Sequence, residues 1–180
     1  EVSRALAGGA DYETEYRILR PDGKVSWIAG LGRVQFAHDG TPVSIRGVVR
    51  DITTRKGVEE ALKESEARFR SVANAAPVMI WMSGPDKLCN FFNDGWLNFT
   101  GRKMEQELGA GWAEGVHPDD LKRCLEVYER FFDARQPFSM EYRLRRYDGD
   151  YRWVMDHGVP RFASDGAFLG FIGTVADITE

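Results

Sequence analysis

Apolar and polar residues alternate with a period of two along three stretches near the end of the sequence. This alternation is the pattern of a strand with one buried face. Asp148-Gly149 and Asp165-Gly166 separate the stretches, and Gly supplies the positive φ that a hairpin turn needs. The pattern therefore predicts three consecutive antiparallel strands, at Phe138 to Arg146, Tyr151 to Phe162 and Phe168 to Ala176.

The same three-strand pattern occurs earlier in the chain, at an offset of 126 residues. Glu15-Tyr16-Arg17 matches Glu141-Tyr142-Arg143, and Asp51-Ile52-Thr53 matches Asp177-Ile178-Thr179, without a gap between these motifs. Self-similarity at a fixed offset indicates two copies of one structural unit. Counting back by this offset, we expect the sequence to begin inside the first copy, as a segment cut from a longer array.

The second copy predicts further elements ahead of its three strands. Val78 to Ser83 and Leu88 to Phe92 are short strand candidates, and Asn93 or Asp94 is expected to cap a short helix. A longer helix is expected to begin at His117-Pro118, where His117 is expected to cap the helix or hydrogen-bond locally rather than bind a metal or haem. Its apolar face consists of Leu121, Leu125, Tyr128 and Phe132. This order of elements predicts an α+β domain with helices on one face of an antiparallel sheet.

A helical linker is expected between the two copies. Residues 54–76 are rich in Glu, Lys, Arg and Ala, and the apolar side is formed by Val58, Leu62, Ser65, Phe69 and Val72. Alternating spacings of four and three are typical of a helix that pairs with another helix. A helix that packs on its own sheet is the alternative. We therefore expect a partial copy at 1–53, a linker at 54–76 and a complete domain at 77–180.

Several motifs of the second copy occur in an order that is familiar from one family. They are Phe92-Asn93, Phe99-Thr100-Gly101, His117-Pro118-Asp119-Asp120, Glu141-Tyr142-Arg143, Arg152-Trp153-Val154 and Asp177-Ile178-Thr179. The chain thereby resembles PAS sensor domains with a PAC-type C-terminal half. The resemblance implies a five-stranded sheet whose concave face, with the helices, encloses a small-molecule pocket. It also implies tandem copies upstream of an output domain, most often a histidine kinase and sometimes a diguanylate cyclase.

Strand parity and the apolar face of the long helix predict which residues line this pocket. The candidates are Trp96, Phe99, Tyr128, Met140, Tyr142, Met155, His157 and Phe171. We expect His157 on the inner face beside Met155, where the first copy has Leu31, because a polar side chain in a cavity often orients a ligand. A core histidine satisfied by a neighbour is the alternative.

Four residues at the strand ends are candidates for relaying a signal. Asp51 and Thr53 end the last strand of the first copy and lead into the linker, and Asp177 and Thr179 occupy the same positions in the second copy. Asp and Thr side chains can cap a helix backbone, so movement of the strand is expected to reach the following helix. A cap without a signalling role is the alternative.

Composition and charge narrow the classes of function. The chain has 24 Lys+Arg against 28 Asp+Glu, a net charge of −4, which argues against nucleic-acid binding. The longest apolar stretch, Val78 to Met82, is far shorter than the roughly 20 residues of a membrane helix. Cys89 and Cys124 lack metal-ligand spacing, which favours a reducing compartment. We expect a soluble, cytoplasmic protein without membrane contact in this fragment.

Neither catalysis nor a required cofactor is predicted. An enzyme would have to use Glu114, His117, Asp119 and Asp120 as an acid/base or metal cluster, but no nucleophile with an orienting partner is evident. The photoactive flavin-binding branch of the family carries a reactive Cys where this chain reads Asn93-Asp94-Gly95-Trp96, so covalent flavin chemistry is not expected. A noncovalent flavin or haem stays open as an alternative without support from the residues, and no metal site is predicted.

These inferences predict a sensory and dimerisation module of a two-component signalling protein, a homodimer whose output domain is a histidine kinase. A small ligand or a partner would shift the inner face, and the last strand would pass the shift to the helix that follows. The alternatives are a ligand-free constitutive dimerisation or spacer domain, and the PAS sensor of a diguanylate cyclase.

Overall fold

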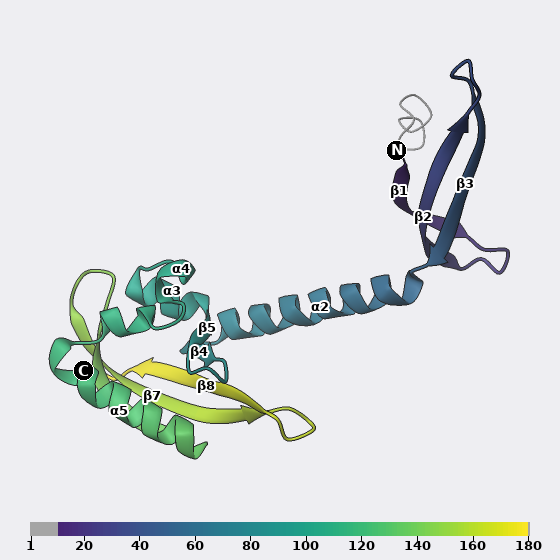
Figure 1. The fold of residues 1–180 in the computed structure, drawn as a ribbon. Coiled ribbons are helices and arrows are strands. Elements are labelled where there is room, and N and C mark those ends of the chain that lie inside the picture. The colour runs from purple at the N-terminus through teal and green to yellow at the C-terminus, as the bar shows by residue number, and fades with distance from the viewer. Residues whose placement is uncertain (1–10, 180) are drawn as a thin grey trace. The chain divides into compact units, whose positions relative to one another are not determined.

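The computed structural model describes residues 11–179, which form two compact units that meet within one helix. The first unit extends to Ala67 and the second begins at Arg68, so α2 (Thr53–Ala75) contributes to both (Figure 1). The first ten residues of the partial copy predicted at 1–53 and the last residue of the domain predicted at 77–180 lie outside this description. Within residues 11–179 no helix combines the length and the apolar character needed to cross a membrane.

The first unit is a three-stranded antiparallel meander. Its strands are β1 (Tyr12–Leu19), β2 (Val25–Phe36) and β3 (Pro42–Asp51), with β2 in the centre. The turn between β1 and β2 closes with a bond from the Gly23 N–H to the Arg20 carbonyl at 2.9 Å. Gly23 has φ of +80°, a conformation that a residue without a side chain adopts at little cost. The predicted meander is confirmed.

The second unit contains a five-stranded antiparallel sheet in the order β5-β4-β8-β7-β6. Its strands are β4 (Met79–Ser83), β5 (Cys89–Phe92), β6 (Phe138–Arg145), β7 (Tyr151–Phe162) and β8 (Phe168–Asp177). The strand that is last in sequence lies in the middle, between β4 and β7 (Figure 1). The α+β fold and its five-stranded sheet are therefore as predicted.

Three α-helices and one 3-10 helix connect β5 to β6. They are α3 (Asp94–Thr100), α4 (Met104–Glu107), the 3-10 helix η1 (Gly111–Gly115) and α5 (Pro118–Ala134). The side chain of Asn93 caps α3 by accepting a bond from the Trp96 N–H at 3.0 Å. His117 caps α5 through Nδ1, which accepts from the Asp119 N–H at 3.2 Å. Both caps confirm the sequence prediction.

The buried face of α5 differs from the predicted one by a single residue. Cys124, Tyr128 and Phe132 are buried, whereas Leu125 is exposed. Successive residues of a helix lie about 100° apart, so a residue next to the centre of the buried stripe already turns toward water. The prediction that Leu125 belongs to the packed face is wrong, and Cys124 takes its place.

Asn93 also joins α2 to the sheet. Its fully buried amide donates to the carbonyls of Ala73 and Val78 at 2.8 and 2.9 Å, and its oxygen accepts from the Ile80 N–H at 2.8 Å. These bonds fix the end of α2 against the first strand of the second unit. A buried amide with this many partners is expensive to replace, because each partner would be left unsatisfied.

The last turns of α2 pack on the outer face of the second sheet. The Phe69 ring lies 5.2 Å from the Phe91 ring of β5, and Ala73 is buried. Val58, Leu62 and Val72 on the predicted pairing seam remain exposed. Packing on the helix's own sheet, the alternative interpretation of this seam, thus holds for Phe69, whereas Val58, Leu62 and Val72 are exposed within residues 11–179.

Candidate functional site

The concave face of the second sheet is built by the register of β6 and β7. Tyr142 lies opposite Val154, and Met140 lies opposite Asp156. All four side chains are buried. Because paired residues of antiparallel strands point to the same face, these positions define the surface that the helices cover.

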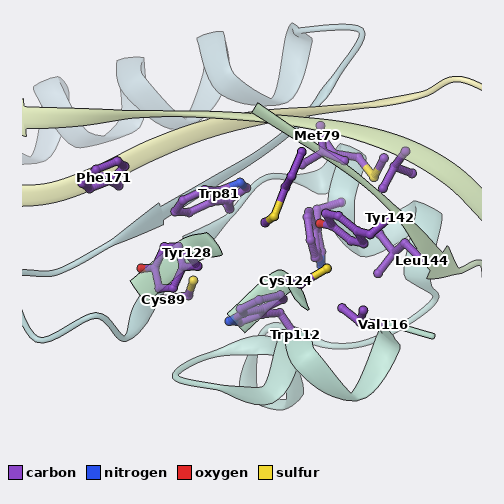
Figure 2. Packing of buried hydrophobic residues seen from close by; sticks show 14 of the residues in the cluster. Met79, Trp81, Cys89, Trp112, Val116, Cys124, Tyr128, Tyr142, Leu144 and Phe171 are labelled. Atoms are coloured by element: carbon purple, nitrogen blue, oxygen red, sulfur yellow. The ribbon is translucent and has the colours of Figure 1, made fainter. Parts of the chain in front are cut away.

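Aromatic rings from β4, β5, β6, α3, α5 and η1 enclose a small cavity above this face. The cavity has a volume of about 10 Å³ and is lined by Trp81, Phe92, Trp96, Trp112, Tyr128, Met140, Tyr142 and Asp156. Figure 2 shows the rings of Trp81, Tyr128, Trp112 and Tyr142 around this part of the core. The Tyr128 ring meets those of Trp81 and Trp112 edge to face, at 5.9 and 6.2 Å. Such contacts favour fixed orientations of the rings that line the cavity.

The size of the cavity limits what this conformation holds. A volume of this order is the space for about one water molecule. A flavin or a haem is many times larger, so the described residues do not fit either group as they are arranged here. A ligand of the size of water fits without rearrangement.

Asp156 is the one charged residue of the cavity lining. It is only 3% exposed, and its Oδ1 accepts from the Trp81 Nε1–H at 3.0 Å. The Tyr142 hydroxyl donates to Oδ2 over a longer distance of 3.4 Å. Burial raises the pKa of Asp156 to about 7, although both hydrogen bonds act to lower it. The carboxyl therefore changes charge near neutral pH.

The structure brings four of the predicted pocket residues together around this cavity. Trp96, Tyr128, Met140 and Tyr142 all line it. Phe171 belongs to the same buried core but does not line the cavity, and Phe99 lines a shallow depression near Pro77 and Val175. Their roles in ligand binding stay predictions.

The prediction that Met155 and His157 line the pocket is wrong, because both lie on the outer face of the sheet. His157 is exposed on the opposite face, where its Nδ1 lies 2.8 Å from the Ser139 hydroxyl. Met155 occupies that same outer face, because Val154 and Asp156 on either side of it face the core. Neither residue can contribute to the cavity.

The error originates in the turn between β6 and β7. A two-residue turn at Asp148-Gly149 would pair even-numbered with odd-numbered residues. Instead the Arg146 N–H bonds the Asp150 carbonyl at 2.8 Å, which leaves a three-residue turn ending at Gly149, with φ of +92°. A shift of one residue moves every side chain of a strand to the other face. Asp156 was missed for this reason, and its counterpart 126 residues earlier is Gly30.

The predicted relay residues form the same hydrogen-bonded motif in both copies, which we call the strand-end clamp. In the first copy, Asp51 Oδ1 accepts from the Thr53 N–H at 2.9 Å, and Thr53 Oγ1 accepts from the Trp27 N–H at 2.9 Å. In the second, Asp177 bonds the Thr179 N–H at 2.9 Å, and Thr179 Oγ1 accepts from the Trp153 N–H at 2.9 Å. Each clamp ties the end of the last strand to the strand beside it.

The clamp of the first copy lies directly at the beginning of α2. Thr53 is the first residue of this helix, and the Lys56 N–H of its first turn bonds the Ile52 carbonyl at 3.0 Å. Lys56 also lies 5.2 Å above the Trp27 ring and makes an ion pair with Glu15 at 2.6 Å. The start of α2 is thus fixed to two strands of the first sheet. Whether movement passes through this junction stays a prediction.

Comparison with known proteins agrees with this architecture. The family model described as "PAS fold" matches residues 1–49 and 90–175. A Sinorhizobium fredii protein, y4lL, is 46% identical over the whole chain, which covers 22% of it. The peroxide stress-activated histidine kinase mak1 of Schizosaccharomyces pombe is 28% identical over 98% of the chain, which covers 12% of it. The chain therefore spans less than a quarter of either relative.

A solved structure supports the fold of the second unit. The PAS domain of an HTR-like protein from Haloarcula marismortui superposes with a TM-score of 0.54 at 21% identity. The match covers 68% of this chain and 99% of that one. At this level of identity the likeness concerns the fold and not the ligand.

Proposed function

The chain belongs to the PAS-fold family, and on that premise we propose that it is a sensory module of a larger signalling protein. A small ligand in the aromatic cavity changes the packing of the inner face, and the strand-end clamps pass the change to the adjoining helices. The observation that carries this proposal is the enclosed cavity with one buried carboxyl. A purely structural core gains nothing from an acidic group that burial penalises.

The relay follows from the position of β8 in the centre of the sheet. It carries Phe171 and Val175 of the buried core and ends at Asp177, the first residue of the second clamp. A displacement of the core would therefore reach Thr179. In the first copy the equivalent path ends on α2.

We propose a histidine kinase as the output domain and the cytoplasm as the location. The similarity to mak1, whose name describes a histidine kinase, supports the first choice.

We also propose the predicted division into a partial copy at 1–53, a linker at 54–76 and a complete domain at 77–180. It is supported by exposure: Tyr16 and Val49 are 41% and 69% exposed, whereas their counterparts Tyr142 and Val175 are 0% exposed. At these two positions the first sheet is thus far more exposed than the corresponding face of the second sheet.

We also propose that the protein works as a homodimer that pairs through α2. Val58, Leu62 and Val72 lie at heptad-like spacing and are exposed. A second copy of the same helix would bury these side chains, which are exposed in the part of the chain that the structure describes. An exposed apolar stripe of this kind is typical of an interface.

The relay is tested in the whole protein by measuring autophosphorylation with substitutions at Thr179. Thr179→Val removes the oxygen that accepts from the Trp153 N–H, and Thr179→Ser keeps it as the matched control. We expect the valine variant to change the kinase rate or its response, and the serine variant to behave like the unmodified protein. If both variants match the unmodified protein while the Trp153 amide loses its protection from exchange, the clamp is a cap without a signalling role.

A separate measurement distinguishes sensing from a ligand-free spacer. Mass spectrometry and an absorption spectrum of protein purified from cells would reveal a retained molecule. A stoichiometric ligand supports sensing. A kinase output that is unaffected by every cavity and clamp substitution supports the constitutive dimerisation or spacer domain.

A further inference from the structure

The cavity combines two features that together select one class of ligand. Six aromatic side chains form most of its wall, those of Trp81, Phe92, Trp96, Trp112, Tyr128 and Tyr142, and the remaining lining residues are Met140 and Asp156. The faces of aromatic rings attract cations, most strongly where water is excluded. A carboxylate inside such a wall adds a direct hydrogen-bond acceptor for a charged N–H group.

Asp156 has no positively charged partner within residues 11–179. Only the Trp81 indole and the Tyr142 hydroxyl donate to it, and no cation contributes to its pKa. Two carboxylate oxygens offer about four acceptor positions, so two remain for a ligand. A buried carboxyl without a counter-ion is a costly arrangement, which a bound cation would relieve.

Comparison of the two copies shows that the fold does not require an acid here. The counterpart of Asp156 in the first copy is Gly30, at the centre of β2. A side chain at Gly30 would meet only ordinary contacts, the nearest being the Tyr16 ring at 3.5 Å. The sheet therefore forms with or without a carboxyl at this position. The acid occurs in the second copy, which is the copy that contains the aromatic cavity.

We propose that this cavity binds a small ammonium-type cation, either ammonium itself or methylammonium. The inference rests on the proposed sensory function and names the ligand class of its site. An N–H group of the cation donates to Asp156, and the remaining N–H or methyl groups face the rings of Trp81, Trp112 and Tyr128. The cavity of about 10 Å³ fits an ion of the size of water, and Met140, a flexible side chain, can move for one methyl group.

The same geometry rejects other cations. Potassium and sodium need several oxygen ligands, and the wall offers few besides the Asp156 carboxylate. Tetramethylammonium has no N–H to donate and exceeds the available space. Selectivity for ammonium over potassium is therefore the signature of the site, since the two ions have the same charge and a similar size.

Binding is expected to compete with protonation of Asp156. The other titratable groups that face this carboxyl are Tyr142 from β6, Tyr128 and Cys124 from α5, and Cys89 from β5. Burial raises the pKa of each of these four groups, so all stay neutral between about pH 6 and pH 8. Asp156 is thus the one group of this set that changes charge in this range, and the cation binds its ionised form.

The experiment measures tryptophan fluorescence and thermal unfolding of the full chain during titration with ammonium chloride. Methylammonium, potassium and tetramethylammonium chlorides serve as comparisons at constant ionic strength. We expect a saturable response to the first two salts only, with an affinity about tenfold higher near pH 8 than near pH 6, as a carboxyl with a pKa of about 7 requires. Equal responses to ammonium and potassium near pH 8 would overturn the proposal.

Two substitutions locate the response. Asp156→Asn should abolish it, and Asp120→Asn, which changes a buried carboxyl that does not line the cavity, should leave it intact. If Asp156→Asn does not fold, the pH dependence of the unmodified chain decides the question, because an affinity independent of pH would contradict a role for Asp156.

The outcome is separable from that of the proposed function. An ammonium response in a protein whose kinase output ignores ammonium would support the site and remove the sensory role. A different retained molecule, together with no response to ammonium, would support sensing and overturn this inference.

Discussion

The buried carboxyl of Asp156 predicts an unusual dependence of stability on pH. Its pKa is raised to about 7 in the folded chain, whereas an unfolded chain returns it to about 3.9. Between these two values the folded chain holds a proton that the unfolded chain has released. The free energy of unfolding of the second unit should therefore fall as the pH rises from about 4 to about 7.

The size of the effect follows from the difference in pKa. About three pKa units correspond to about 4 kcal/mol, which is lost in full above pH 7. Asp156→Asn removes the ionisation and keeps an oxygen that can accept from the Trp81 Nε1–H. We expect the variant to exceed the unmodified chain in stability by up to about 4 kcal/mol near pH 8, with little difference near pH 4.

Urea unfolding followed by tryptophan fluorescence measures this effect, because Trp81, Trp96 and Trp112 report on the second unit. Asp120→Asn is the control, because the contribution of Asp120 to the free energy of unfolding changes with pH in the opposite direction. Arg143 binds the Asp120 carboxylate through Nε at 2.8 Å and holds its pKa at about 2. That contribution, about 2 kcal/mol, is present above about pH 4 and is lost as the pH falls toward 2. Parallel pH profiles for the Asp156→Asn variant and the unmodified chain would refute the reasoning.

Three further substitutions test the clamp, the junction and the seam. Thr53→Val should lower the free energy of unfolding by about 1 kcal/mol and speed hydrogen exchange at the Trp27 amide, which loses its acceptor. Asn93→Ala should cost about 3 kcal/mol in urea unfolding because its buried partners stay unsatisfied, whereas the exposed control Asn74→Ala should cost less than about 1 kcal/mol. Leu62→Glu, at a position that is 59% exposed, should shift sedimentation from dimer to monomer with unchanged circular dichroism, and a persistent dimer would contradict pairing through α2.

Local patterns were sufficient to predict the elements of the fold. The alternation of apolar residues located the strands, and Gly149 and Gly166 marked turns that do contain positive φ. The Asn93 and His117 caps were predicted from residue type and position alone. These features depend on interactions within a few residues, so one sequence contains the information that they need.

The residues that line the cavity could not all be predicted, because the alternation of apolar and polar residues does not give the length of a turn or the packing between distant elements. One additional residue in the turn before Tyr151 reversed the faces of β7, which brought Asp156 inside and placed His157 outside. The outer face of β7 is also rich in apolar residues, Trp153 and Met155 among them, so hydrophobicity could not reveal the error. Trp81, Phe92 and Trp112 were missed because their orientation follows from packing between elements far apart in the chain.

Comparison of the two copies shows that the hydrogen bonds at the end of the last strand are the same in both, whereas the residue at the cavity position differs. In both, the last strand bonds its neighbour in the same way, from Ile52 N–H to Trp27 carbonyl at 2.8 Å and from Ile178 N–H to Trp153 carbonyl at 2.9 Å. This geometry persists although the two sheets differ in cover and in the residue at the cavity position. A substitution at that position can therefore change which ligand is bound without disturbing the strand-end clamp. The proposed relay and the proposed ligand site can vary independently, because separate sets of hydrogen bonds maintain them.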